Sequence, residues 1–158
     1  MTARKKMEEK KTIPVKVYDG TNLLLGRLAS LVAKDALMGL EVRVVNCEKV
    51  VISGKRQNVL AHEYQRFQRG GYPLKGPRVS RLPDRFFRRT VRGMLPHKQA
   101  RGREAWKRVM CYVGLPPEFQ NQPLLSPSPS SVKKLPHLHY ATLLDVCQQM
   151  GLGGHTHT

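Results

Sequence analysis

The sequence predicts an α/β domain with three α/β/α layers built around a mainly parallel sheet of about four strands. Between residues 13 and 114, short runs rich in valine and isoleucine alternate with amphipathic helical segments. This alternation is typical of a parallel sheet with helices on both faces. The chain has 158 residues, 40% of them hydrophobic, so one domain can bury a continuous core. Basic loops and a C-terminal arm and helix complete the expected architecture.

The first strand and the first helix have the clearest patterns. Residues 13–18 alternate isoleucine and valine with other residues and stop at the turn signal Asp19-Gly20. From Leu25 onward apolar residues recur at helical spacing, and Gly39 supplies a stop signal. We therefore expect a strand that leads through a turn into a helix.

Two more strands and a second helix should follow. Residues 41–46 are rich in valine, and residues 50–52 form a short β-branched run. Ser53 is a candidate cap for a helix that ends near residue 68. This helix is expected to turn four side chains partly inward: Val59, His62, Tyr64 and Phe67.

The middle of the chain predicts a loop, two helices and a further strand. Residues 70–83 contain three glycines and three prolines, which indicates a loop. Pro83 suits the first turn of the next helix, because proline lacks the amide hydrogen that this turn leaves unpaired. A short helix at residues 103–108 and a strand at 109–113 should follow.

The last part of the chain divides into an arm and a helix. Residues 115–136 are rich in proline and serine, which predicts an extended arm lying on another surface. An amphipathic segment at 140–150 predicts the final helix. The expected organisation has four parts: a basic tail at 1–12, an α/β core at 13–114, a Pro/Ser-rich arm at 115–139, and a C-terminal helix with a Gly/His tail at 140–158.

Positive charge is concentrated in the core. The net charge is +17, and residues 66–108 contain fourteen lysines and arginines but only two acids. Four arginines at i, i+3, i+4 and i+7 share one side of the helix that starts at Pro83: Arg85, Arg88, Arg89 and Arg92. Four apolar residues occupy its other side and should be buried: Phe87, Val91, Met94 and Leu95. A folded scaffold would thus present the charge in a fixed array.

This array favours RNA as the partner. Like charges at i, i+4 repel by a few tenths of a kcal/mol, and phosphate groups would offset that repulsion. Arginine forks suit phosphate contact and base stacking. Interleaved glycines permit a sugar-phosphate chain to approach closely: Gly70, Gly71, Gly76, Gly93 and Gly102. The sequence lacks helix-turn-helix, zinc-finger and aromatic RNA-recognition motifs, so no DNA partner is expected.

Nucleotide and metal sites have weaker support. Five residues separate Gly20 from Gly26, and Arg27-Leu28 follows, which departs from the spacing of a phosphate-binding loop. A tight turn with close helix packing is the favoured interpretation of these glycines. Two His-x-His pairs, at 137/139 and 155/157, would need further ligands to hold a metal. We therefore expect no metal site and no cofactor, and these imidazoles should face solvent or RNA.

Catalysis and membrane binding also lack the residues they require. No nucleophile has a recognisable base, and the eleven acids are scattered, so we predict no catalytic residues and no enzyme. Cys47 follows an apolar strand and should be a buried small hydrophobe. The three cysteines form no CxxC pair, which fits a reducing compartment. Apolar runs are too short to cross a membrane, so no membrane partner is expected.

An ordered series of motifs carries a family resemblance. GRLAS lies at residues 26–30, VVNCEKVVISGK at 44–55, RTVRGMLPHK at 89–98, GREAWKR at 102–108 and CYVGLPP at 111–117. Together they resemble the universal large-subunit ribosomal protein L13 family. The stretch GPRVSRLPDRFFRRTVRGMLPHK at 76–98 is similar to its archaeal and eukaryotic branch. The resemblance covers about residues 15–117 and becomes faint in the last helix.

The resemblance implies a structural ribosomal protein without catalytic activity. Such a protein binds large-subunit rRNA, helps it fold during assembly and contacts neighbouring large-subunit proteins. It would be cytoplasmic, on the ribosome, and nucleolar during assembly if the source is eukaryotic. RNA contact maps onto twelve residues: Arg78, Arg81, Arg85, Arg88, Arg89, Arg92, His97, Lys98, Arg101, Arg103, Lys107 and Arg108.

Two other functions remain open at this point. An RNA-modifying or nucleotide-dependent enzyme could use the same basic surface to hold its substrate, and saturable binding of ATP, GTP or a methyl donor would favour it. An RNA-binding regulator acting off the ribosome is also compatible with the sequence.

Overall fold

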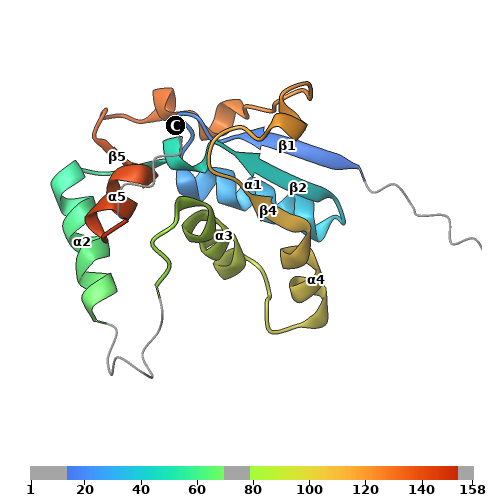
Figure 1. The fold of residues 1–158 in the computed structure, drawn as a ribbon, viewed down its shortest axis with the longest axis horizontal. Coiled ribbons are helices and arrows are strands. Elements are labelled where there is room, and N and C mark those ends of the chain that lie inside the picture. Colours follow the sequence, from blue (N-terminus) through green and yellow to red (C-terminus); the bar gives the residue numbers. More distant parts are fainter. Residues whose placement is uncertain (1–13, 70–78, 153–158) are drawn as a thin grey trace, which may run out of the picture.

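The computed structural model describes residues 14–69 and 79–152. Within these ranges the strands are β1 (Val15–Asp19), β2 (Glu41–Val45), β3 (Val51–Ser53), β4 (Val109–Cys111) and β5 (Tyr140–Thr142). The helices are α1 (Leu25–Leu37), α2 (Arg56–Gln68), α3 (Pro83–Met94), α4 (Ala100–Arg108) and α5 (Leu143–Gln149). Figure 1 shows α2 and α5 at one end of the long axis and α4 towards the other.

The main sheet is parallel and has the order β1-β2-β4. Val15 pairs with Glu41 and Val42 pairs with Val109, so β2 is the central strand. Valines dominate this strand because a central parallel strand is covered on both faces. The predicted α/β class and mainly parallel sheet are confirmed.

The sheet has three strands rather than about four, because β3 leaves it. Only residues 46–50 separate β2 from β3, whereas a parallel neighbour in one sheet needs a crossover of about a dozen residues or more. β3 pairs antiparallel with β5 in a separate two-stranded sheet, in which Val51 is opposite Thr142. Residues 140–142, expected to start the last helix, are therefore a strand.

Helices cover one face of the main sheet, and the arm covers part of the other. The large core cluster joins Leu28 and Val32 of α1 to Phe87 and Val91 of α3 and to Val44 of β2. A second, smaller cluster consists of Val17, Val45 and Phe119, with Tyr112 packed against it. None of these four residues belongs to an α-helix. The layer on that face is thus a 3₁₀ turn at Pro117–Phe119 rather than the α-helix expected there.

The Pro/Ser-rich arm lies on the protein's own core. Leu125 accepts a backbone hydrogen bond from Asp19 (3.1 Å) and donates one to Val17 (2.9 Å). Further along, the carbonyl of Ser130 accepts one from Leu24 (2.7 Å). The two bonds of Leu125 satisfy backbone groups on the outer edge of β1, which would otherwise be unpaired. Figure 1 shows the arm passing beside β1.

The turn between β1 and α1 is tight, as the sequence predicted. The Asp19 carboxylate accepts hydrogen bonds from the backbone and hydroxyl of Thr21 (3.1 and 2.8 Å) and from the Asn46 amide (2.8 Å). A Cβ on Gly20 would lie 2.7 Å from a methyl group of Val50 and 2.9 Å from the carbonyl of Asn46. Glycine is needed at position 20 for close packing, which confirms the predicted tight turn. The predicted close helix packing was wrong for Gly26, which has open space beside it in α1.

The second helix is less buried than the sequence predicted. Val59 and Phe67 are half-buried, but His62 and Tyr64 are exposed, because α2 packs mainly on the side that faces α5 and β5. The predicted cap was also wrong: Ser53 ends β3, and the residue at the N-cap is Lys55, whose side chain makes no capping bond. No helix of the described chain is long and apolar enough to span a membrane.

Candidate nucleic-acid interface

The arginine-rich helix α3 is oriented by its buried face. Pro83 occupies its first turn, as predicted, and Phe87 and Val91 are fully buried in the core. Leu95, just after the helix, is also buried. Met94 was predicted to be buried with them, but 44% of it is exposed. The reason is that α3 ends at Met94, and this side chain reaches past the covered face into an open groove.

The four arginines of the predicted array converge on one hollow of about 260 Å³. Its lining consists of Arg85, Arg88, Arg89 and Arg92 from α3 and Trp106 from α4. Arg88 is half-buried, whereas the other three arginines are exposed. No acidic residue lines the hollow. The helical spacing therefore grouped these residues correctly.

Trp106 holds two of these guanidinium groups, and sequence reasoning missed it. The central carbon of the Arg88 guanidinium lies 4.3 Å from the centre of the indole ring, and that of Arg92 lies 5.9 Å away. Such cation–π contacts are favourable and fix the plane of the cation. The available signal was that the chain's single tryptophan falls within residues 66–108, the basic block of the sequence. The pairing itself needed the fold, because it joins two helices.

Two nitrogen donors beside the hollow lack acceptors. Arg88 Nε and Trp106 Nε1 are buried, and neither has a hydrogen-bond partner among residues 14–69 and 79–152. Leaving a buried donor unpaired costs about 1–3 kcal/mol. An acceptor that reached these donors, such as a phosphate or base oxygen, would relieve that cost.

Three of the other predicted site residues are tied to the fold. Arg81 stacks on Phe67 at 4.9 Å and donates a hydrogen bond to the Gly151 carbonyl (3.4 Å). Arg103 donates to the carbonyl of Lys98 (3.3 Å). Arg108 donates to the Ala36 carbonyl (3.4 Å). The second terminal nitrogen of Arg108 also lies 3.9 Å from the Glu104 carboxylate. Part of each of these three side chains therefore stabilises the protein itself.

The remaining predicted residues lie apart from the hollow. Lys98 and Lys107 are exposed, and His97 is half-buried. The Nδ1 atom of His97 lies 3.4 Å from the carbonyl oxygen of Leu95. Arg101 lines a different groove, between α1 and the ends of α3 and α4. Arg78 falls outside the described residues.

The glycines of the basic block do not all serve close approach of RNA. A Cβ on Gly102 would lie 2.1 Å from the carbonyl oxygen of Pro96. Gly102 therefore permits α4 to pack against the turn that follows α3, which corrects its predicted role. Gly93 has open space beside it and remains compatible with an approaching strand. The other three glycines, Gly70, Gly71 and Gly76, lie outside the described ranges.

Two of the three cysteines, Cys47 and Cys147, are poor nucleophiles in this fold. Cys47 is fully buried, as predicted. A hydrogen bond with Cys111, followed by burial, raises its pKa well above the ordinary value. Burial, aided by the negative charge of Asp84, raises the pKa of Cys147 to about 12. Both groups are thiols at neutral pH, whereas catalysis by cysteine requires the thiolate.

The described chain offers no cluster for a metal ion. Within residues 14–69 and 79–152, no three residues of the types His, Cys, Asp and Glu are placed to hold one. The rings of His137 and His139 are 6.3 Å apart and exposed. His155 and His157 lie beyond the described part.

Comparison with known proteins gives one consistent match. The model of a family described as "Ribosomal protein L13" matches residues 14–118. A protein of Methanopyrus kandleri named "Large ribosomal subunit protein uL13" is 44% identical over 138 residues, covering 85% of this chain and 86% of its own length. A protein of the same name from Methanococcoides burtonii is 44% identical and covers 85% of this chain and 96% of its own length. Another, from Archaeoglobus fulgidus, is 39% identical and covers 87% of this chain and 88% of its own length.

Proposed function

This chain belongs to the ribosomal protein L13 family, and from that membership we propose that it is a structural constituent of the large ribosomal subunit that binds large-subunit rRNA. The matched segment includes the whole parallel sheet and helices α1 to α4. The three relatives described above are archaeal, in keeping with the branch that the sequence resembles. The observation that carries the proposal beyond family membership is the hollow lined by four arginines and Trp106.

The hollow is suited to the sugar-phosphate backbone of folded RNA. Its guanidinium groups offer forked donors that match phosphate oxygens. Trp106 limits the freedom of Arg88 and Arg92, so less side-chain entropy is lost when they bind. We place the main contact at the hollow. The other predicted residues would form its margin: Arg78, Arg81, His97, Lys98, Arg101, Arg103, Lys107 and Arg108.

Binding of this kind would help the RNA to fold. A rigid cationic surface draws together phosphate groups that otherwise repel each other, and shape-dependent contacts then select one arrangement. We infer contacts with neighbouring large-subunit proteins and a cytoplasmic location on the ribosome. A nucleolar stage would apply only to a eukaryotic source. The role is structural, without catalysis or cofactor.

Each of the two alternatives to the ribosomal function would give a distinct binding result. Saturable binding of ATP, GTP or a methyl donor would favour an RNA enzyme. Specific binding to an RNA outside the ribosome would favour a regulator, a role that can coexist with the first.

The experiment is a salt titration of two variants with matched charge. Arg85→Gln combined with Arg92→Gln removes two exposed cations of the hollow and leaves the half-buried Arg88 in place. The control, Lys133→Gln with Lys134→Gln, removes two exposed cations of the arm. For binding to purified large-subunit rRNA, the logarithm of affinity falls with the logarithm of salt concentration. If both arginines contact phosphate, this slope should become less steep by about 2 in the arginine variant. The control should change the slope by much less.

Different outcomes test the assignment of the binding surface and the ribosomal function. Equal effects of the two double variants would show that the charge acts without regard to position and would contradict the assignment of the hollow. Failure of the unaltered chain to sediment with large subunits would contradict the ribosomal function itself.

A further inference from the structure

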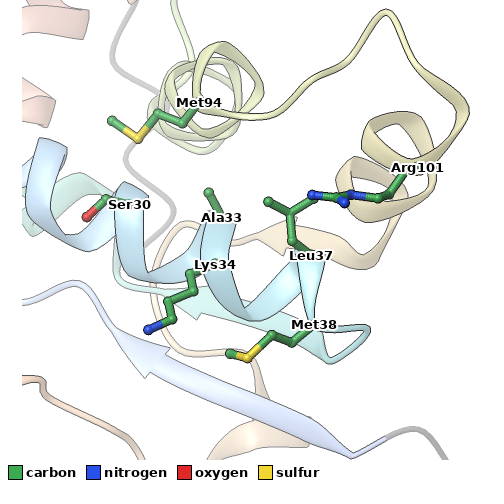
Figure 2. Close-up of a pocket in the computed structure, with 7 residues that line it drawn as sticks. All are labelled: Ser30, Ala33, Lys34, Leu37, Met38, Met94 and Arg101. Atoms are coloured by element: carbon green, nitrogen blue, oxygen red, sulfur yellow. The ribbon is translucent and has the colours of Figure 1, made fainter.

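A second and larger concavity lies beside α1, outside the arginine hollow. It is a groove of about 620 Å³ between the outer side of α1 and the ends of α3 and α4. Figure 2 shows Arg101 of α4 reaching towards Leu37 of α1, and Ala33 and Leu37 on the side of α1 that faces Met94 and Arg101. Lys34 and Met38 leave α1 on its other side. The groove and the hollow have no lining residue in common.

The groove presents apolar side chains to the outside. Met38 is 60% exposed and Met94 is 44% exposed, and between them lie the half-buried Leu37 and the buried Ala33. Methionine is flexible and polarisable, so it adapts to the shape of a partner. Methionine and arginine are also enriched at the centres of protein–protein interfaces. An apolar surface of this kind is typical of a place that another molecule covers.

The charges at the groove have one sign. Lys34 and Arg101 line it, and no acidic residue does. Both side chains are exposed, and no ion pair joins either of them to another residue of the described chain. A partner that fits this pattern combines an apolar anchor with a carboxylate.

The geometry and chemistry separate this groove from the surface assigned to RNA. Met94 follows Arg92 by two positions, which is about 200° around the helix, so the two side chains leave α3 in nearly opposite directions. Splayed-out RNA bases are usually held by stacking on aromatic rings. The groove has no aromatic ring in its lining. Aliphatic and thioether groups instead match the side chains of a protein.

We propose that this groove docks a segment of a neighbouring large-subunit protein that carries an apolar anchor beside an aspartate or glutamate. The inference rests on the proposed ribosomal function and adds the chemistry of one partner. The anchor, a leucine, methionine or phenylalanine, lies against Leu37 and Met94. The carboxylate pairs with Arg101 or Lys34.

Site-directed photo-crosslinking in purified large subunits tests the proposal. A diazirine amino acid replaces Met94 in the full chain, the chain is incorporated into subunits, and the adduct is sequenced by mass spectrometry. The expected adduct is a protein segment with an apolar residue at the attachment point and an aspartate or glutamate within a few residues. A diazirine at the exposed Gln57 of α2 is the positional control and should not yield the same segment.

A charge test accompanies the crosslink. Lys34→Glu should lower the yield of the Met94 adduct at least fivefold, whereas Lys34→Arg should preserve it. The control Lys133→Glu lies on the arm and should leave the yield unchanged. An adduct with RNA, an adduct with the chain's own residues 1–13, no adduct, or a yield indifferent to Lys34→Glu would each overturn the proposal. Each of these results leaves the ribosomal function standing if the chain still sediments with large subunits.

Discussion

At the scale of single residues, Trp106 determines how the arginine hollow is built. Its ring lies under the Arg88 guanidinium at 4.3 Å, on a helix that follows α3 after a short turn. Arginine side chains are normally long and mobile. Stacking on an aromatic ring restricts them already in the folded protein, so they lose less side-chain entropy when a partner binds. The arginines of the hollow are therefore partly ordered by the protein itself, before any partner binds.

Replacing Trp106 by leucine should weaken RNA binding without abolishing it. The loss of a cation–π contact worth about 0.5–1 kcal/mol corresponds to an affinity about two- to fivefold lower. Trp106→Phe keeps a ring face and should lose less. Filter binding with large-subunit rRNA measures both, and thermal unfolding checks that the variants fold. Affinity of Trp106→Leu equal to that of the unaltered chain would show that the stack does not prepare the site.

Two glycines of the basic block should respond to alanine in opposite ways. Gly102→Ala forces a Cβ to within 2.1 Å of the Pro96 carbonyl oxygen, and overpacking of this kind costs about 1–3 kcal/mol or more. Gly93→Ala meets open space inside α3 and should stabilise the fold by about 0.5–1 kcal/mol. Urea unfolding of both variants measures the difference. Similar stabilities of the two would contradict the packing described for α4.

Residue patterns predicted the arginine array but not its surroundings. The i, i+3, i+4, i+7 spacing is local, so the helix alone brings Arg85, Arg88, Arg89 and Arg92 to one side. The stacking of Trp106 on the arginines and the close contact of Gly102 with Pro96 depend on how α4 packs against α3 and the turn after it. The local spacing of residues in the sequence does not encode this packing. Met94 was misjudged for a similar reason, because the burial of a helix position requires another element to cover it.

At the scale of elements, α2 and α5 form a unit with its own stabilising contacts. Thr142 and Asp145 make a reciprocal capping box at the start of α5. Asp145 also pairs with Arg56 of α2 at 3.2 Å. Burial opposes the charge of Asp145, but hydrogen bonds from Arg56 and Thr142 outweigh it and lower its pKa below the ordinary value of 3.8. The carboxylate therefore supports the helix start and the contact between the two helices.

Removing this charge should make stability less dependent on pH in the acid range. A lowered pKa in the folded state contributes stability that is present above the ordinary value of 3.8 and is lost as pH falls through the folded value. Asp145→Asn should cost about 1 kcal/mol at pH 7, and this cost should shrink below about pH 4. Glu118→Gln, at an exposed carboxylate, should stay within about 0.5 kcal/mol. Urea unfolding from pH 7 to 3 is the measurement, and a pH-independent difference for Asp145→Asn would contradict this assignment.

Most elements were predictable, because hydrophobic period and turn residues are local signals. The strand at 140–142 was not, since it exists by pairing with β3, which lies about ninety residues earlier in the sequence. The same pairing explains why β3 is absent from the main sheet. A β-branched run indicates a strand, but its partner is decided by the length of the connection and by the rest of the fold.

At the scale of the whole molecule, the fold sorts its surface into regions of different chemistry. The net charge of +17 gives general attraction to RNA, whereas α3 concentrates four arginines at one hollow. The groove beside α1 is apolar with a cationic edge and lies on another side of α3. The arm bonds to the outer edge of β1 and contributes no residue to the lining of the hollow or the groove. If both proposals hold, one small domain contacts RNA and a protein at the same time.

The most direct test of this account is a map of the native large subunit at a resolution that shows side chains. We expect the guanidinium groups of Arg85, Arg88, Arg89 and Arg92 to lie within hydrogen-bond distance of phosphate or ribose oxygens of the large-subunit RNA. A map in which these four groups face solvent or only protein would contradict it.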